Sequence, residues 1–199
     1  MSLRRGRVGV NENDEPGLGA RGRRMGAWAV APDKAMKTNP AIASCLRTRL
    51  ASEADLPRLV ELINSAYAIE TFLEGTRTNR EEVAASLKKG SILVVEADGA
   101  VVATIYAEVR GGRGYLGMLA VDPAQQGKGL ARRVMEAAEE HLRGLGCTGV
   151  DILVLSLRPE LPPVYRRFGY VETGTEDFCY NRTFRDGAQG HCIVMSKVL

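Results

Sequence analysis

A junction of strand, glycine-containing loop and helix constrains this chain more than any other part of its sequence. Residues 115–121 form an apolar run, residues 122–129 contain Pro123 and two glycines, and an amphipathic pattern begins at Leu130. Small residues let the backbone approach a ligand closely, and the unpaired N–H groups and dipole of a helix N-terminus favour an anion. The junction therefore predicts a loop that binds a diphosphate, with a plain strand-to-helix turn as the alternative.

Other phosphate-binding motifs do not fit. The Walker pattern fails because Asp122 stands where its first glycine belongs and Gly129 follows Lys128. A G-x-G-x-x-G pattern occurs at residues 17–22 and again at residues 112–117. The first lacks a preceding strand and the second leads into a strand instead of a helix, so both are interpreted as coincidence.

Hydrophobic periodicity places the loop in a mixed α/β fold. Capping-box patterns at Ser52–Asp55 and Thr78–Glu81 mark the first two helix starts, and Pro162-Pro163 opens the last helix. The order β-α-α-β-β-β-α-β-α-β-β predicts a mixed, mostly antiparallel central sheet with helices on both faces. The expected strands cover residues 46–50, 92–97, 101–109, 115–121, 150–157, 169–172 and 192–198, and the helices 56–67, 78–90, 130–145 and 162–168.

The helix after the glycine loop is the longest one predicted. Its end is expected at Gly144 or Gly146, since glycine commonly terminates helices. The continuous apolar run that follows, residues 150–157, predicts a central strand buried on both faces. The buried stripe of the helix is predicted to be Leu130, Val134, Ala138, Leu142 and Leu145.

Charge is distributed unevenly along the chain. The net charge of the 199 residues is +3, but residues 1–46 carry +4 and the remainder carries −1. The overall basicity therefore indicates no nucleic-acid face on the folded part, and no nucleic-acid partner is expected. A hydrophobic fraction of 45% excludes a wholly disordered chain. No apolar stretch reaches about 18 residues, so no membrane span is expected.

Residues 1–45 are predicted to be a basic, disordered arm that precedes one domain over residues 46–199. The arm is rich in Gly, Arg, Ala and Pro and shows no sustained helical or strand period. A translation start placed too early, with Met25 or Met36 as the true start, is an open alternative. A nucleic-acid-binding arm and an Arg-rich organelle presequence are further alternatives, although acidic residues such as Glu12 argue against a presequence.

The cysteines and histidines show no metal-ligand spacing. They are far apart in sequence, with no C-x-x-C pair, so no metal is expected. Buried small apolar cysteines are the favoured interpretation, and without a signal-peptide pattern we expect reduced thiols and a cytoplasmic location. The residues concerned are Cys45, Cys147, Cys179, Cys192, His141 and His191.

Two motifs resemble those of a known family. The run Gln126–Ala131 matches the Gln/Arg-x-x-Gly-x-Gly/Ala signature of the GNAT superfamily of N-acetyltransferases. The run Tyr165–Tyr170 resembles that family's Tyr-x-x-x-Gly-Phe motif, with Tyr170 in place of Phe. The resemblance covers residues 46–199 and implies the acyl-CoA N-acyltransferase fold. It also implies transfer of an acetyl group from acetyl-CoA to a primary amine by direct attack in a ternary complex.

The resemblance also implies the cofactor-binding residues. Backbone amides over Gln126–Arg132 would cradle the pyrophosphate, and the strand edge at Leu119 and Val121 would pair with the pantetheine arm. The strand over residues 150–157 would splay away to admit the thioester, and the Leu119 N–H would polarise its carbonyl. Lys128, Arg132 and Arg133 are candidates for the 3′-phosphate. The full cofactor-binding set is Leu119, Ala120, Val121, Gln126, Gly127, Lys128, Gly129, Leu130, Ala131 and Arg132.

Catalytic side chains are harder to assign. Tyr165 matches the position of the family's general acid, which protonates the departing thiolate, and aromatic packing is the alternative. Some members carry a Glu on the fourth strand as base, but residues 115–121 contain no carboxylate. Glu70, Glu74 and Glu108 are the remaining candidates, and the base stays unassigned.

The resemblance implies an amine-bearing acceptor, either a small molecule or a protein or peptide, which the sequence does not identify. The family lines this pocket with segments that correspond to residues 67–78 and 175–190, and the acidic residues there would suit a cationic amine. Arg158 stands where many members carry Asn, and by position Arg158 and Glu160 are further candidates to face the acceptor. The candidates in the two segments are Glu70, Phe72, Glu74, Glu176, Asp177 and Tyr180.

Two departures from the family pattern motivate an alternative function. The absent strand carboxylate and Arg158 are compatible with a non-catalytic acyl-CoA-binding sensor on the same fold. Tyr165 argues for the enzyme. The oligomeric state stays open, with a homodimer among the states considered.

Overall fold

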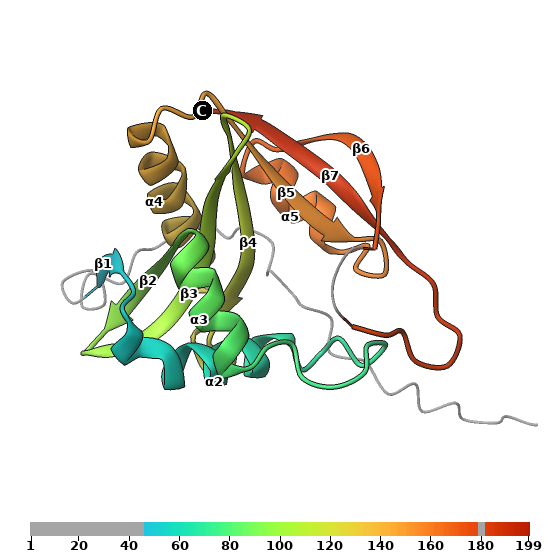
Figure 1. The fold of residues 1–199 in the computed structure, drawn as a ribbon, viewed down its shortest axis with the longest axis horizontal. Helices are drawn as coiled ribbons and strands as arrows, with labels where there is room; N and C mark the ends of the chain where they lie inside the picture. Colours follow the sequence, from blue (N-terminus) through green and yellow to red (C-terminus); the bar gives the residue numbers. More distant parts are fainter. Residues whose placement is uncertain (1–45, 179–181) are drawn as a thin grey trace, which may run out of the picture.

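One sheet organises the residues that this computed structural model describes, which are 46–178 and 182–199. Its seven strands run in the order β1-β2-β3-β4-β5-β7-β6, and every neighbouring pair is antiparallel except β4 and β5 (Figure 1). The predicted arm over residues 1–45 lies outside the described residues. The strands are β1 (Arg47–Leu50), β2 (Ser91–Ala97), β3 (Ala100–Arg110), β4 (Arg113–Val121), β5 (Gly149–Leu155), β6 (Val171–Asp177) and β7 (His191–Val198). The helices are η1 (Glu53–Asp55), α2 (Leu56–Tyr67), α3 (Arg80–Lys89), η2 (Pro123–Gln125), α4 (Leu130–Gly144) and α5 (Leu161–Arg167).

Helices cover both faces of the sheet, which confirms the predicted fold class. In β2, Leu93 and Val95 join a core cluster with α4, whereas Ile92 and Val94 join a second cluster with α2. Because successive side chains of a strand point to opposite faces, this alternation places α4 and α2 on opposite sides. Both faces of β2 are therefore buried, which explains its uninterrupted apolar run.

The predicted helix boundaries are mostly confirmed, with two corrections. Helix α3 is capped by Asn79, whose Oδ1 accepts the Glu82 N–H at 2.9 Å, and not by Thr78. Thr78 is buried and exchanges two hydrogen bonds with the Asn64 side chain, at 2.9 and 3.0 Å. Leu145 follows the last helical residue and is 57% exposed, so it does not belong to the buried stripe of α4.

The ends of β5 and β6 differ by two or more residues from those predicted. Strand β5 ends at Leu155, and β6 continues to Asp177 because it pairs along most of β7. The β6 residues are exposed, so no apolar alternation marked the strand in the sequence. Tertiary pairing sets its length.

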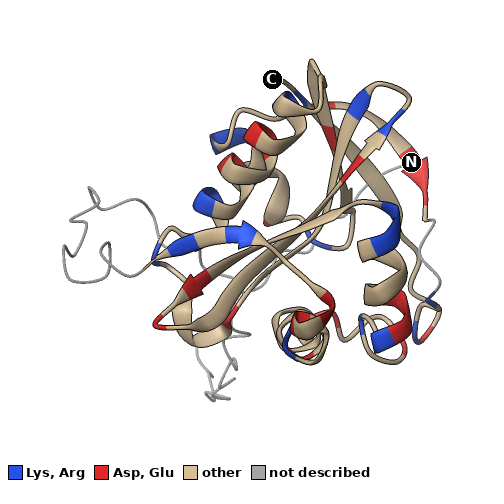
Figure 2. Ribbon diagram, turned by 60° about the vertical axis from the view of Figure 1, so that its left-hand side comes forward, with Lys and Arg blue, Asp and Glu red and all other residues tan. Residues whose placement is uncertain are grey.

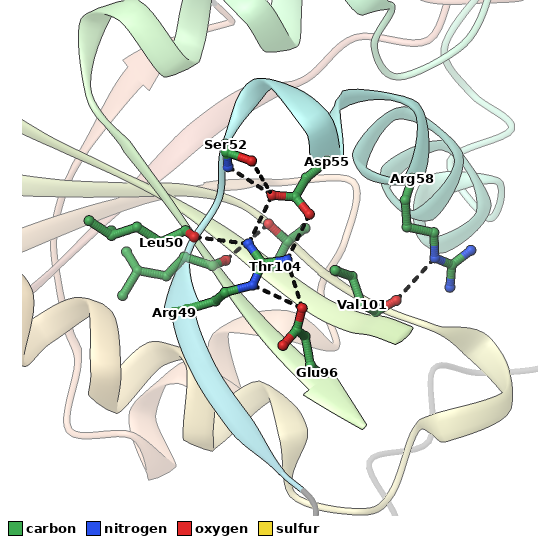
Figure 3. A network of polar contacts seen from close by, with 9 residues as sticks. Arg49, Leu50, Ser52, Asp55, Arg58, Glu96, Val101 and Thr104 are labelled. Carbon is green, nitrogen blue, oxygen red and sulfur yellow. Dashed lines mark hydrogen bonds and ion pairs between the residues drawn. The ribbon is translucent and has the colours of Figure 1, made fainter. Parts of the chain in front are cut away.

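A guanidinium ties the edge strand β1 to the start of α2. Arg49 on β1 donates hydrogen bonds of 2.7 and 2.8 Å to the two carboxylate oxygens of Asp55, and of 2.7 and 2.9 Å to Glu96 on β2 (Figure 3). Asp55 Oδ2 also accepts the Ser52 N–H at 2.7 Å, the acidic half of the predicted capping box. This network fixes the chain's entry into the first helix.

Charged residues of both signs are distributed over the described part of the fold. Figure 2 shows Lys and Arg positions interspersed with Asp and Glu positions over the strands and helices. Cys147 and Cys192 are buried and form no disulfide with each other, while Cys45 and Cys179 lie outside the described residues. Within the described ranges, no helix combines the length and apolar character needed to cross a membrane.

The Asp55 network gives a pH-dependent stability. Hydrogen bonding from Arg49 holds the pKa of Asp55 well below its ordinary value. A carboxyl group whose pKa falls on folding stabilises the protein above its unfolded pKa of about 3.9, and that contribution is lost as the pH falls further. We therefore expect Asp55→Asn to lower the free energy of unfolding by about 1–3 kcal/mol at neutral pH.

The measurement is chemical denaturation of both proteins across the acid range. The difference between wild type and Asp55→Asn should shrink as the pH drops below about 4, since Asp55 then takes up a proton in the unfolded chain while it stays ionised in the folded one, which favours unfolding of the wild type. Glu53→Gln, a neighbouring exposed change, serves as the control. A difference that is constant with pH would contradict the assigned role of Asp55.

Candidate active site

Strands β4 and β5 part in the middle of the sheet. Their parallel pairing runs from Gly114 opposite Val150 to Leu116 opposite Ile152 and stops there. Beyond Leu116, β4 remains paired with β3, and β5 remains paired with β7. The edge of β4 over residues 117–121 therefore has no strand partner on the β5 side within the described chain. An extended ligand can pair with such an edge as an added strand does.

A β-bulge interrupts the pairing of β4 with β3 within the segment that has no partner on the β5 side. Thr104 of β3 faces Ala120 and Tyr106 faces Gly117, so β4 contains one residue more than β3 over this stretch. Met118 in the bulge has a φ of 49°, a left-handed conformation that is uncommon for a residue other than glycine. Bulges of this kind turn backbone groups out of a ladder and are frequent beside active sites. No signal in the sequence marked this one.

The parted strands enclose a pocket with about 560 Å³ of empty space, including its open mouth. Main-chain and side-chain groups of β4 and β5 form its walls. Residues from α2, the α2–α3 connection, the β5–α5 connection and α5 close it. The lining residues outside the two strands are Tyr67, Glu70, Arg77, Ile105, Arg158, Leu161 and Tyr165.

The glycine loop follows the unpaired edge of β4 along the chain and ends at the start of α4. Gly127 and Gly129 have φ of 77° and 76°, in the left-handed region that favours glycine. Gly129 is the N-cap of α4, and no side chain caps the helix. Residues 126–129 are exposed, and a Cβ built on either glycine would meet no atom within 4 Å. Uncapped N–H groups and open space fit an anionic group such as a diphosphate.

Only some of the predicted cations lie along the loop. Lys128 Nζ donates to Gln125 Oε1 at 2.6 Å, and Arg132 lies 3.6 Å from Glu136 on the first turns of α4. Arg133 is directed elsewhere, because its guanidinium donates to the Leu46 carbonyl at 3.0 Å and to the Thr48 hydroxyl at 3.3 Å. Lys128 is therefore the cation on the loop itself. The Arg132 guanidinium is directed towards the end of α5, where it donates to the Arg167 carbonyl at 3.4 Å and lies 5.4 Å from the centre of the Phe168 ring, and Arg133 anchors the start of β1.

Tyr165 lines the pocket and is held by aromatic neighbours. Its ring packs edge-on against Phe168 and Tyr170, with centroids 6.3 and 6.2 Å away. Tyr170 is fully buried, and its hydroxyl donates to Glu139 at 2.9 Å. Burial raises the pKa of Tyr165 well above its ordinary value, so its phenol keeps its proton at neutral pH.

A buried ion-pair cluster closes the pocket opposite the strands. Arg158 Nη1 donates to Glu70 Oε1 at 3.0 Å, and Arg158 Nε donates to Glu160 at 2.5 Å. Arg77 Nη1 lies 3.6 Å from Glu70 Oε2. Burial raises the pKa of Glu70, while Arg77 and Arg158 oppose that rise. Burial also raises the pKa of Tyr67, to about 12.

The two segments expected to form the acceptor side come together. Leu73 and Phe184 form an antiparallel bridge, the Glu74 N–H donates to the Thr183 carbonyl at 2.9 Å, and the Arg185 N–H donates to the Phe72 carbonyl at 2.9 Å. Among the predicted acceptor residues, Glu70 lines the main pocket and Glu74 lines a smaller adjoining hollow. Glu176 and Asp177 are exposed on β6, and Tyr180 lies outside the described residues.

The structure separates the three candidate bases. Glu108 is buried, pairs with Lys89 at 2.9 Å and Arg110 at 2.8 Å, and does not line the pocket. Glu74 is exposed, whereas the side chain of Glu70 is only 8% exposed at the pocket wall. Tyr67 and Arg77 lie at the two ends of the segment expected to line the acceptor pocket, residues 67–78, but the sequence did not single out either side chain.

No group of three or more His, Cys, Asp or Glu side chains in the described part of the chain is arranged to hold a metal ion. The chemistry that this pocket can support from its own residues is binding of an anion at the loop and of an extended ligand along β4. It also includes proton donation by a phenol and proton acceptance by a buried carboxylate.

Comparison with known proteins gives consistent results. The model of the Acetyltransferase (GNAT) family matches residues 56–170, which is more than half of the chain. A curated relative, glucosamine 6-phosphate N-acetyltransferase 1 of Oryza sativa subsp. japonica, is 35% identical over 112 residues. That match spans 52% of this chain and 66% of the relative.

Solved structures show the same fold. Ribosomal-protein-alanine N-acetyltransferase from Brucella melitensis aligns with a TM-score of 0.64 and 22% identity, covering 77% of this chain and 99% of its own. The yncA protein from Salmonella typhimurium, solved with its cofactor acetyl-CoA, aligns with a TM-score of 0.62 and 20% identity. The alignment covers 77% of this chain and 94% of the yncA chain. With the family model matched across the loop, the parted strands and Tyr165, this chain belongs to the GNAT family of acetyltransferases.

Proposed function

We propose that this protein transfers the acetyl group of acetyl-CoA to a primary amine, by direct attack of the amine in a ternary complex. The observation that carries the proposal is the opening between β4 and β5, which has an uncapped glycine loop at one end and Tyr165 in its wall. Acetyl-CoA supplies an activated thioester. The protein's own part is to bind, orient and exchange protons.

The glycine loop and the β4 edge would hold the cofactor. Backbone N–H groups over Gln126–Arg132 would bind the pyrophosphate, with Lys128 and Arg132 adding positive charge nearby. The unpaired edge at Leu119 and Val121 would hydrogen-bond the pantetheine amides. The N–H of Leu119, next to the bulge, would donate to the thioester carbonyl and stabilise the charge that develops there.

Tyr165 would act as the general acid. The raised pKa keeps the phenol protonated, so it can donate a proton to the coenzyme A sulfur as the carbon–sulfur bond breaks. The nitrogen of the acceptor gives up a proton in the same step, so Tyr165 regains one directly or through water. Its edge-on contacts with Phe168 and Tyr170 would keep the hydroxyl aimed into the pocket.

The acceptor is an amine whose identity requires an assay. One relative acts, by its name, on glucosamine 6-phosphate, and a structural neighbour acts on a ribosomal-protein alanine. A panel should therefore contain amino sugars, their phosphates and peptides with a free N-terminus. Acetyl-CoA binding without turnover on any amine would instead support a non-catalytic acyl-CoA sensor.

Substitution of Gly129 tests the loop. We expect Gly129→Glu to weaken acetyl-CoA binding by at least about tenfold relative to Gly129→Ala, because it places a negative charge beside the pyrophosphate. Gly129→Ala is the matched control, since both variants carry the same strain at a φ of 76°. Isothermal titration calorimetry gives both affinities. Equal affinities would contradict the loop assignment.

Substitution of Tyr165 tests the acid. Tyr165→Phe should lower kcat by at least about tenfold, because the thiolate must then leave without a proton donor. The dissociation constant of acetyl-CoA should stay within roughly threefold, since the ring is retained. Tyr170→Phe, a second buried tyrosine whose hydroxyl contacts Glu139, is the control and should keep wild-type turnover. Full activity of Tyr165→Phe would remove the acid role.

A further inference from the structure

One oxygen of Glu70 is buried without a hydrogen-bond donor. The Glu70 side chain is 8% exposed, and its Oε1 is satisfied by Arg158 at 3.0 Å. Its Oε2 has no hydrogen-bond partner among the described residues, since Arg77 at 3.6 Å is beyond hydrogen-bonding distance. A buried carboxylate oxygen without a donor is costly, so it requires an explanation.

The position of Glu70 between two spaces explains why one of its oxygens is left without a donor. Glu70, Tyr67 and Arg77 line both the pocket between β4 and β5 and the smaller hollow under the connection between α2 and α3. The first space also contains Tyr165 and the bulged segment of β4 at Leu119. Glu70 therefore lies where a molecule in the smaller hollow meets the space proposed for the thioester.

From this geometry, and resting on the proposed function, we propose that Glu70 binds the ammonium group of the acceptor through Oε2 and removes its proton. The N–H bond breaks, the proton passes to the carboxylate, and the nitrogen keeps the electron pair with which it attacks the thioester carbon. Glu70 then releases that proton to solvent. The second proton that nitrogen loses replaces the one that Tyr165 gives to sulfur, so the overall reaction releases one proton.

The surrounding charges suit this role. Burial raises the pKa of Glu70, which makes the carboxylate a better proton acceptor, while Arg77 and Arg158 favour its ionised form. Glu160 adds a negative charge that favours protonation, and the neutral phenols of Tyr67 and Tyr165 also face this cluster. Arg158 acts as a positioning residue, because it holds Oε1 and leaves the lone pairs of Oε2 for the acceptor.

The other carboxylates fit this role less well. Strand β4 carries none, and Glu108 is occupied by Lys89 and Arg110 away from the pocket. Glu74 is exposed, so its interaction with an ammonium group would compete with water. Glu70 lines the pocket with a side chain that is 8% exposed, and its Oε2 accepts no hydrogen bond within the described residues.

Glu70→Gln gives the central test, because it removes the proton acceptor and keeps the shape. Two acceptors are compared at neutral pH: an amine that wild type acetylates from the panel and that is protonated at this pH, and hydroxylamine, whose nitrogen is largely unprotonated. We expect kcat/KM to fall by about 100-fold or more for the protonated amine, and by less than about tenfold for hydroxylamine. Glu81→Gln, an exposed change on α3, should match wild type with both.

The pH profile gives a second readout. The ratio of wild-type to Glu70→Gln kcat/KM should narrow as the pH rises towards the pKa of the acceptor amine, because the amine then arrives unprotonated and needs no base. Glu70→Asp retains a carboxylate in a different position, so its kcat/KM should keep an acidic limb that is shifted in pH from that of wild type, at a lower rate. Melting temperature and acetyl-CoA affinity are measured for every variant, so that a loss of folding is recognised.

The outcomes separate the two proposals. An equal loss with both acceptors at every pH indicates a structural role and overturns the assignment of Glu70, as does an unchanged rate for Glu70→Gln. If Glu70→Gln does not fold, an acidic limb in Glu70→Asp at the wild-type pH overturns the assignment, whereas a shifted limb supports it. If wild type acetylates no amine, the proposed function fails and the assignment of Glu70 fails with it.

Discussion

The parallel pairing of β4 and β5 ends after Leu116, and the rest of the site depends on that limit. Because β5 stays bound to β7 and β4 to β3, the two halves of the sheet diverge without losing their own ladders. The divergence leaves the edge of β4 over residues 117–121 without a strand partner on the β5 side. Along the chain this edge is followed by the glycine loop and the N-terminus of α4, an order that suits a long, partly anionic ligand.

The charged side chains that line the pocket form ion pairs with one another. Charge here is compensated by a cluster of one carboxylate, Glu70, and two guanidinium groups, those of Arg77 and Arg158, all at low exposure. Glu160 pairs with Arg158 at the margin of the cluster. Breaking such a cluster is costly because each removed partner leaves an uncompensated buried charge. The cluster also changes the meaning of Arg158. It stands where many family members carry Asn, and here it orients a carboxylate on the acceptor side.

Much of this arrangement could be predicted from local patterns, and the remainder could not for identifiable reasons. The apolar alternation of β2, the stripe of α4 and the glycines of the loop each report on neighbours in sequence, so the element order was correct. Strand β6 carries no apolar pattern because both its faces are exposed, and its length depends on β7. Asn79 caps α3 in place of Thr78, because the side chain of Asn64, fourteen residues earlier on α2, hydrogen-bonds both the N–H and the carbonyl of Thr78.

The sequence by itself determined the order of strands and helices, the glycine loop before α4 and the position of the Tyr165 motif, because each rests on residue types within a few positions of one another. Tertiary structure decided which of three glutamates reaches the pocket, where the arginines point and where β4 bulges. Those features join α2, β4, β5 and α5, and the burial that leaves Glu70 Oε2 without a donor exists only once these elements pack together.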